Sequence, residues 1–294
     1  MLASFIKHHH LPDVFEQTAN NYYLPIAEQI THKAKTSSVP LFVGINGCQG
    51  SGKSTLASFL AAYISEKHQL NVLVMSLDDF YLSQAKRQVL AQTVHPLLAT
   101  RGVPGTHDTK LMAEVFKKLS LNQSDFVIPR FNKAADEPCD KSQWQHVDST
   151  VDIVLFEGWC WGINAQSLPE LESPVNALEQ RYDAEGIWRQ YVNAQLINQY
   201  QPLYRYFDFW VVLQAPSFDC VYRWRLEQEE KLAKHLQENA STSKVMTAQQ
   251  VNDFIQFFQR LTEHGLATLG QSADILLTLD SQRQIMHSSY GETS

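Results

Sequence analysis

The central motif of this chain is the run Gly44-Ile45-Asn46-Gly47-Cys48-Gln49-Gly50-Ser51-Gly52-Lys53-Ser54-Thr55. From Gly47 to Ser54 it has the spacing G-x-x-x-x-G-K-[ST], in which glycines let several backbone N–H groups converge on one anion. The preceding run, Val39 to Ile45, is apolar and β-branched, and Leu56 to Ile64 carry apolar side chains at helical spacing. A strand, a glycine-rich loop and a helix in this order predict a triphosphate-binding loop. The alternative is an ordinary glycine-rich turn.

The motif assigns a role to each position of the loop. Lys53 is expected to reach the β- and γ-phosphates as a catalytic residue, and the Ser54 hydroxyl is expected to ligate Mg²⁺. We therefore expect ATP and Mg²⁺ to bind here. The predicted nucleotide-binding residues are Gly47, Cys48, Gln49, Gly50, Ser51, Gly52, Lys53, Ser54 and Thr55.

Composition narrows the class of protein. The chain has 294 residues, 44% of them hydrophobic, which suits one large α/β domain with insertions or two small domains. Its formal net charge of −7 argues against a nucleic-acid surface. No run of about 18 apolar residues predicts a membrane span, and the N-terminus has no signal-peptide pattern. Four cysteines without C-x-x-C spacing are typical of reduced thiols, so we expect a cytoplasmic protein.

Acidic residues follow two other apolar runs. Leu70 to Leu77 predicts a buried strand that leads into Asp78 and Asp79, and Val151 to Phe156 predicts another that leads into Glu157. In open α/β sheets, ligands bind at the carboxyl ends of the strands. Asp78 is therefore a candidate general base, or else a metal ligand or hydroxyl-orienting group, and Glu157 is a candidate partner of Mg²⁺. A solvated turn or helix cap is the alternative for the two aspartates.

The rest of the sequence predicts the fold and the division of the chain into parts. We expect an α/β P-loop fold with three layers and a mainly parallel sheet. The predicted parts are a helical N-terminal extension (1–38) and a kinase domain (39–294) with a substrate-side insertion (78–148) and a lid region (216–245). Further predicted elements are a helix over 12–36, a helix over 177–199, a strand over 208–213, a helix over 247–264, a strand over 273–279, and a frayed tail after residue 280.

Several polar residues have two interpretations. Arg101, His107 and Asp108 lie on a Gly- and Pro-containing loop, where they suit a small hydroxylated or anionic substrate or serve only as loop and cap residues. The helix that includes Arg223 and Arg225 is a lid over the nucleotide or an amphipathic surface helix with ion pairs. Oxidation of Cys48 inside the loop is a hypothetical block to nucleotide binding. The run from His8 to His10 is expected to be solvated surface.

The sequence bears on two other functional classes. A GTPase is disfavoured because the run from Asn132 to Asp136 is one residue too long for N-K-x-D, and the strand ending in Glu157 lacks D-x-x-G. A nucleotide-dependent regulatory protein without transfer activity stays an alternative. The presence of Lys53, Ser54 and Asp78 beside Glu157 favours an enzyme, since a degenerate binder is expected to lose the base first.

Five motifs occur here in a familiar order: the glycine-rich loop, SLDDFYL, RGVPGTHD, FEGW and VYRWRLEQE. Over about residues 39 to 265 the chain resembles the D-glycerate 3-kinase group, a branch of the phosphoribulokinase, uridine kinase and pantothenate kinase superfamily. The resemblance implies an ATP-dependent kinase of a small metabolite. It implies that Asp78 is the base and a metal contact, with Tyr81 near the substrate, and that Glu157 is the magnesium partner. It places Arg101, His107 and Asp108 at the substrate, with Asp79 beside them, and Arg223 and Arg225 in the lid, Arg225 as a catalytic group.

One departure from the nucleoside kinases bears on the acceptor. Where they have a tyrosine after a proline, this chain has Pro129-Arg130-Phe131. An arginine suits a carboxylate or phosphate better than a neutral nucleoside. We therefore predict a small, anionic acceptor, D-glycerate or a similar hydroxy acid, with Arg130 among its contacts. The alternatives are a sugar, nucleoside or pantothenate-like acceptor; the sequence leaves the oligomeric state open and predicts no nucleic-acid or membrane partner.

Overall fold

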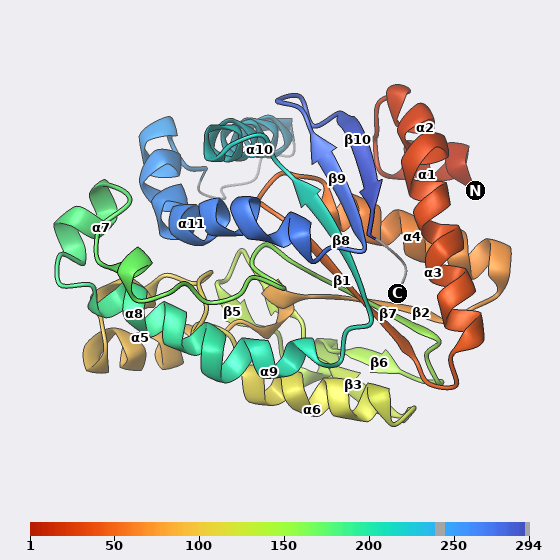
Figure 1. Cartoon of the computed structure of the whole chain (residues 1–294), viewed down its shortest axis with the longest axis horizontal. Coiled ribbons are helices and arrows are strands. Elements are labelled where there is room, and N and C mark those ends of the chain that lie inside the picture. Colours follow the sequence, from red (N-terminus) through yellow and green to blue (C-terminus); the bar gives the residue numbers. More distant parts are fainter. Residues whose placement is uncertain (239–244, 292–294) are drawn as a thin grey trace.

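The structure is a computed structural model that describes residues 1–238 and 245–291. Six strands in this part of the chain form one sheet, and all run parallel except the edge strand β10 (Figure 1). The predicted mainly parallel α/β fold is therefore confirmed. In spatial order the strands are β10 (Ile285–Tyr290), β9 (Ile275–Leu279), β8 (Phe209–Gln214), β1 (Leu41–Gly47), β7 (Ile153–Gly158) and β2 (Val72–Ser76).

The edge strand β10 corrects one expectation. The tail after Asp280 was predicted to fray, but Ile285–Tyr290 pairs antiparallel with β9. The Asp280 carboxylate accepts hydrogen bonds from the backbone N–H groups of Gln282 and Gln284 and so closes the turn between the strands. Only Ile285 of this strand is buried, so its sequence carries almost no apolar pattern.

The two faces of the sheet are covered by different helices, because successive strand residues point to opposite sides. Leu41, Val43 and Ile45 of β1 pack in one core with α4 (Lys53–His68), whereas Phe42 packs in the other with α6 (Thr109–Ser120). Figure 1 shows α6 on the side of the sheet opposite α10 (Phe218–Glu238), which shares the core of α4. This gives the three layers of the fold.

The N-terminal helices belong to the same core as α4. They are α1 (Leu2–His8), α2 (Val14–Thr18) and α3 (Leu24–Thr36), with a π-helical segment at Ala19–Tyr23. The rings of Phe5 and Phe15 lie 5.4 and 5.9 Å from the ring of Phe59 on α4. The first helix, α1, was not expected from the sequence.

The helix predicted over 177–199 is divided in two. Helix α7 (Ala177–Tyr182) ends before Asp183, whose carboxylate accepts hydrogen bonds from the backbone N–H groups of Trp188 and Arg189 and caps α8 (Ile187–Gln195). Gly186 has φ of +78°, a conformation that breaks the helix. A π-helical segment (Leu196–Tyr200) and α9 (Gln201–Tyr204) follow.

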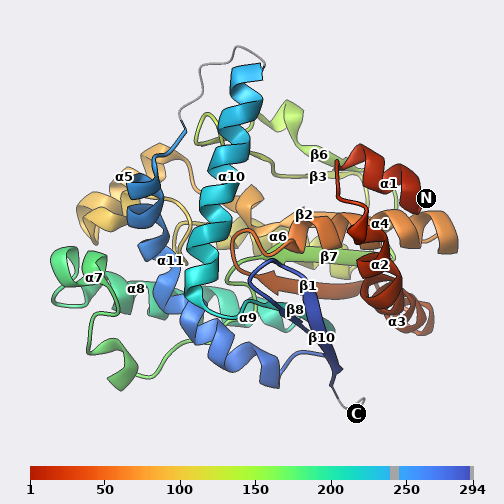
Figure 2. The same cartoon turned by 90° about the horizontal axis from the view of Figure 1, so that it is seen from above.

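Two long helices lie side by side across one end of the sheet (Figure 2). They are α10 (Phe218–Glu238) and α11 (Ala248–Thr268). Part of the predicted lid region, residues 239–244, lies outside the described residues. No helix among residues 1–238 and 245–291 is long and apolar enough to cross a membrane.

The segment 78–148 adds small elements beside the sheet. After a 3₁₀ turn at Leu77–Phe80 come α5 (Gln84–Thr93) and α6, and then two antiparallel strand pairs. Strand β3 (Phe126–Ile128) pairs with β6 (Gln145–Val147), and β4 (Phe131–Asn132) pairs with β5 (Glu137–Pro138). We call residues 131–138 the β4–β5 hairpin.

Candidate active site

The glycine-rich loop has the geometry that its sequence predicts. It runs from the end of β1 at Gly47 to the start of α4 at Lys53. Gly50 and Gly52 have φ values of +80° and +96°, which favour glycine and turn the backbone N–H groups toward one point. The loop therefore forms an anion cradle at the N-terminus of a sixteen-residue helix.

Helix α10 packs directly on this loop. A Cβ atom added to Gly50 would lie 2.7 Å from the Cβ atom of Trp224. Arg225 and Gln228, on the same helix, line the pocket that contains Lys53. Arg223 instead donates a hydrogen bond to the Cys220 thiol and lines a separate hollow between α10 and α11. Of the two predicted lid arginines, the structure brings only Arg225 to the cradle.

An oxygen-rich corner lies beside the cradle. The Ser54 hydroxyl donates to Glu157 at 2.8 Å, and the Ser76 hydroxyl donates to the same carboxylate oxygen at 3.1 Å. The other oxygen of Glu157 is buried, has no hydrogen-bond partner and lies 3.6 Å from the Lys53 ammonium group. Oxygen donors with one unsatisfied carboxylate oxygen fit Mg²⁺, a hard cation. The residues present therefore fit the metal that the sequence predicts.

Asp78 faces this corner from the end of β2. One of its carboxylate oxygens accepts from the Tyr81 hydroxyl at 2.9 Å and the other from the Lys133 ammonium group at 2.6 Å. Burial alone would raise the pKa of Asp78, but Lys133 and Lys53 outweigh it and hold that pKa below its ordinary value. Asp78 is therefore ionised at neutral pH, as a proton acceptor must be.

Lys53 is held charged by its neighbours. Burial works to lower its pKa, but the carboxylates of Glu157 and Asp78 outweigh it and raise the pKa above its ordinary value. The cradle thus carries a fixed positive charge between two acids.

The pocket between these groups has a volume of about 330 Å³ and contains four basic side chains and one acidic side chain, Asp78. Lys53 and Arg225 lie on the helices around the cradle, whereas Arg101 and Lys133 come from the segment 78–148. Aromatic rings complete the wall. The pocket residues are Gln49, Gly50, Lys53, Ser54, Asp78, Tyr81, Arg101, Lys133, Trp159, Arg225, Gln228, Phe254 and Phe258.

Arg101 is fixed by the β4–β5 hairpin. Its guanidinium donates to Asp136, whose other carboxylate oxygen accepts from the buried Arg87 at 2.7 Å. The guanidinium lies 5.9 Å from the ring centre of Tyr81 and 5.5 Å from that of Phe131. Asp136 therefore orients Arg101 in the pocket wall.

His107 lies behind this wall, not in it. Its ring stacks on Tyr81 with ring centres 4.5 Å apart, and its Nδ1 shares a 2.6 Å hydrogen bond with the Tyr200 hydroxyl. The side chain is buried and does not line the pocket. Burial lowers the pKa of His107 to about 3, so the ring is neutral at physiological pH. The structure supports a positioning contact to Tyr81 in place of the predicted substrate contact.

The buried neutral His107 predicts a stability that falls in acid. Below the unfolded pKa of about 6.5, the unfolded chain binds a proton that the folded chain does not, so this residue lowers the free energy of unfolding by about 1.4 kcal/mol per pH unit between 6.5 and 3. Urea unfolding at pH 7 and pH 5 measures the loss, of which His107 should account for about 2 kcal/mol, because about 1.5 pH units of this interval lie below 6.5. His107→Gln should remove about that part of the loss, and an unchanged loss in this variant would contradict the assignment.

Three predicted substrate residues are engaged elsewhere. Asp79 accepts from Arg130 at 2.7 Å, and both residues line a hollow along β2 that includes Ser54 and Glu157 of the oxygen-rich corner but not Asp78. Arg130 also donates to Gln145. The Asp108 carboxylate caps α6 by accepting from the backbone N–H of Leu111 at 3.1 Å. Arg130 and Asp79 therefore lie outside the pocket that contains Asp78, and the acceptor contacts expected of these two residues and of Asp108 stay predictions.

Cys48 is a poor target for oxidation. Its side chain is buried at the base of the loop, and burial raises the pKa of the thiol to about 12. A thiol with this pKa carries very little thiolate at neutral pH. The hypothesis that oxidation of Cys48 controls nucleotide binding therefore loses its support.

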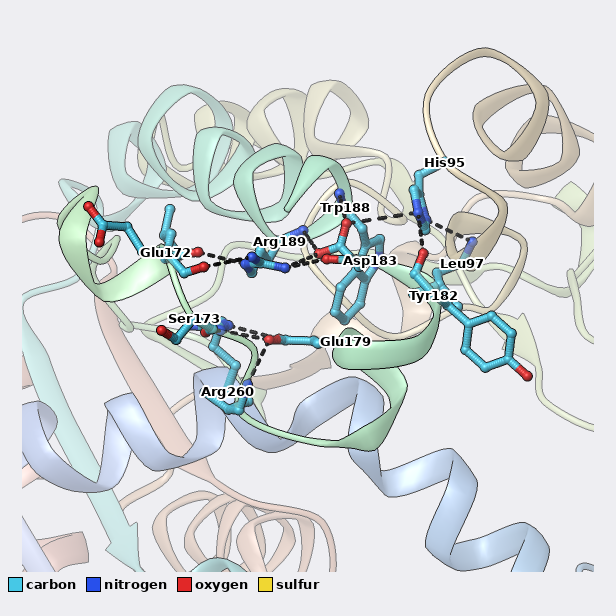
Figure 3. A network of polar contacts seen from close by, with 12 residues as sticks. His95, Leu97, Glu172, Ser173, Glu179, Tyr182, Asp183, Trp188, Arg189 and Arg260 are labelled. Carbon is cyan, nitrogen blue, oxygen red and sulfur yellow. Dashed lines mark hydrogen bonds and ion pairs between the residues drawn. The ribbon is translucent and has the colours of Figure 1, made fainter. Parts of the chain in front are cut away.

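Buried ion pairs brace the side of the pocket formed by α11 (Figure 3). Arg260 of α11 donates to both carboxylate oxygens of Glu179 on α7 at 2.8 and 2.6 Å. Asp183, which follows α7, pairs with Arg189 at 3.0 Å and lies 3.8 Å from the His95 ring nitrogen. The loop that begins at His95 and leads to Arg101 is thus tied to the helix that carries Phe254 and Phe258.

The chain is similar in sequence to known proteins. No protein-family model matches the chain. The chain is 30% identical to the chloroplastic D-glycerate 3-kinase of Arabidopsis thaliana over 285 aligned residues. The alignment covers 88% of this chain and 58% of the plant protein. The chain is 35% identical to the uncharacterized kinase mug58 of Schizosaccharomyces pombe over 232 aligned residues. That alignment covers 75% of this chain and 81% of mug58. The chain belongs to the D-glycerate 3-kinase-like P-loop kinases.

The fold of this kinase is also found in a solved relative. The structure of D-glycerate 3-kinase from Cryptococcus neoformans matches it with a TM-score of 0.76 and 26% identity, over 95% of this chain and 99% of that one. The protein is therefore a kinase, and D-glycerate 3-kinases are among its relatives.

Sequence reasoning missed several residues of the kinase site. Ser76 was missed although it lies two residues before Asp78. Its hydroxyl at the end of a strand, just before an acid, was the signal that could have identified it. Lys133 was visible as a basic residue after the short strand, but nothing local connected it with Asp78. Phe254 and Phe258 formed an aromatic helix face without an assigned partner.

Proposed function

We propose that this kinase transfers the γ-phosphate of ATP to a hydroxyl group of D-glycerate or a closely similar small hydroxy acid. The observation that carries the proposal is the charge of the pocket lining: Arg101 and Lys133 come from the segment 78–148, and among the described residues Asp78 is the one acid that lines the pocket. The acids that pair with Lys53, Arg101 and Arg225 do not line it. The lining is therefore mainly basic and favours an anionic acceptor over a neutral sugar or nucleoside.

In the proposed reaction the glycine-rich loop binds the phosphates of ATP, and Lys53 and Arg225 balance the negative charge at the γ-phosphate. Asp78 accepts the proton of the acceptor hydroxyl as its oxygen bonds to phosphorus and ADP leaves. Tyr81 orients the Asp78 carboxylate through its hydrogen bond. The rings of Trp159, Phe254 and Phe258 help to exclude water.

Glu157 and Ser54 are the residues that would hold Mg²⁺, with Asp78 facing the same corner. The cation would neutralise charge on the β- and γ-phosphates. In the proposed reaction Asp78 is the base and also lies next to the metal. The cytoplasmic location inferred from the cysteines stays a prediction.

ADP release with a panel of acceptors tests the proposal. The panel contains D-glycerate, L-glycerate, glycerol, uridine, pantothenate and ribose, each with ATP and Mg²⁺. We expect D-glycerate to give the highest kcat/KM and glycerol, which lacks the carboxylate, to give at least about 100-fold less, as for the loss of one or two charge-assisted hydrogen bonds. Higher turnover of a neutral sugar or nucleoside would favour the alternative acceptor class. No acceptor-dependent turnover would favour the regulatory protein.

A further inference from the structure

In the pocket, the proposed base Asp78 is bound to the side chain of Lys133. The ammonium group of Lys133 lies 2.6 Å from Asp78 Oδ2, and both side chains line the pocket in which the acceptor is proposed to bind. An acceptor hydroxyl and this ammonium group therefore compete for the lone pairs of one carboxylate oxygen, because the other oxygen accepts from Tyr81. Release of Lys133 frees Asp78 Oδ2 for the hydroxyl.

The side chain of Lys133 is built to move, whereas its backbone is held. The Asn132 side chain accepts hydrogen bonds from the backbone N–H groups of Ala134 and Ala135, and Arg101 donates to the Lys133 carbonyl at 3.4 Å. The Lys133 side chain itself is 62% exposed. An ion pair of such an exposed lysine contributes about 0–1 kcal/mol, and the lysine stem has four flexible bonds.

The other cations of the pocket are less free. Arg101 is bonded to Asp136, which is bonded in turn to the buried Arg87. Arg225 pairs with Glu229 on its own helix. Lys53 belongs to the phosphate cradle. Lys133 is therefore the cation of the pocket that can change partners at least cost.

We propose that Lys133 selects acceptors that carry a carboxylate, by exchanging its bond to Asp78 for a bond to the acceptor. The inference rests on the proposed function. In glycerate the carboxyl carbon is separated by two carbon–carbon bonds from the carbon of the terminal hydroxyl. A hydroxyl placed on Asp78 therefore brings the acceptor carboxylate within the reach of the Lys133 side chain.

The exchange explains why a hydroxy acid would be a good acceptor and why a neutral acceptor would be a poor one. An acceptor with a carboxylate offers Lys133 a replacement partner and at the same time frees Asp78. A neutral acceptor offers no replacement, so Lys133 stays on Asp78 and competes with the hydroxyl. Without Lys133, the carboxylate of an anionic acceptor would be repelled by the Asp78 carboxylate, because no cation would lie between the two.

The test is the substitution Lys133→Met, which removes the charge and keeps most of the stem. We expect KM for D-glycerate to rise about 10- to 100-fold, the range for one charge-assisted hydrogen bond. We expect kcat/KM for glycerol to stay the same or to rise, because nothing then competes for Asp78. The ratio of the two kcat/KM values should fall at least about 10-fold, and Lys133→Arg should restore part of it.

Lys86→Met is the matched control. Lys86 also pairs with an aspartate, Asp108, and its side chain is 63% exposed, but it does not line the pocket. We expect its kinetic constants for both acceptors to equal those of the wild type. ATP affinity, measured with a fluorescent nucleotide, and the melting temperature show whether either variant disturbs the nucleotide site or the fold.

The outcomes separate the two proposals. If the wild type turns over no hydroxy acid, the proposed function fails, and this inference fails with it. If the wild type uses D-glycerate and Lys133→Met lowers kcat/KM equally for D-glycerate and glycerol, Lys133 only positions Asp78 and the inference alone is overturned. An unchanged KM for D-glycerate in this variant overturns it as well.

Discussion

The substitution Asp78→Asn should lower kcat by on the order of 10²- to 10⁴-fold, the usual contribution of a general base, and change the ATP dissociation constant by less than about threefold. Asparagine keeps the size of the side chain and can still accept a hydrogen bond from Tyr81. It cannot take a proton from the acceptor. The loss should therefore appear in turnover and not in nucleotide binding, which depends on the loop and Lys53.

Asp79→Asn is the neighbouring control for this experiment. Asp79 lies one residue further along the same turn, but its carboxylate pairs with Arg130 and does not line the pocket that contains Lys53 and Asp78. We expect its kcat to fall less than about 10-fold. Steady-state ADP release and nucleotide titration measure both variants. If Asp78→Asn weakened ATP binding as much as turnover, Asp78 would act mainly through the metal corner and not as the base.

The donor half of the site could be predicted from sequence because its residues follow strong local patterns. The loop lies between an apolar strand and a helix, and Asp78 and Glu157 lie at or next to the carboxyl ends of two parallel strands. Such strand ends meet at one edge of a sheet whatever the intervening chain does. The insertion between Asp78 and Glu157 therefore did not obscure their proximity, and Ser54 and Glu157 are in hydrogen-bond contact.

The acceptor half could not be predicted in the same way. Arg130 and Lys133 are three residues apart, yet the first binds Asp79 and the second binds Asp78. The choice is set by the β4–β5 hairpin, whose strands have two residues each and carry no periodic signal. Asp136 likewise orients Arg101 from a distance of thirty-five residues in sequence. Side-chain partners across irregular segments depend on tertiary packing, which spacing does not reveal.

The two predicted lid arginines also could not be told apart from sequence. Arg223 and Arg225 are two residues apart on α10, and residues at this spacing point to different sides of a helix. Only one of them can face the loop on which α10 packs. Sequence placed the helix near the nucleotide but could not choose between its two arginines, because the face that contacts Gly50 is fixed by Trp224.

The largest expected effect on stability comes from Arg260→Met. Arg260 is bonded to Glu179, whose side chain is fully buried, and it also donates to the carbonyl groups of Glu170 and Ser173 (Figure 3). Methionine fills similar space but leaves the Glu179 carboxylate without its cation. Removing one partner of a buried pair costs about 3–5 kcal/mol, so we expect the free energy of unfolding in urea to fall by that amount.

Two further variants decide whether the buried charge is the cause. The double substitution Glu179→Met with Arg260→Met removes both charges, and it should recover much of the loss because buried ion pairs contribute little beyond an apolar replacement. Arg283→Met removes a pair whose side chains are 28% and 36% exposed, and it should cost less than about 1 kcal/mol. Equal losses in the single Arg260 variant and the double variant would show that packing, not charge, holds α11 against α7. Because α11 also carries Phe254 and Phe258, the single variant should raise KM for the acceptor at temperatures where it is still folded.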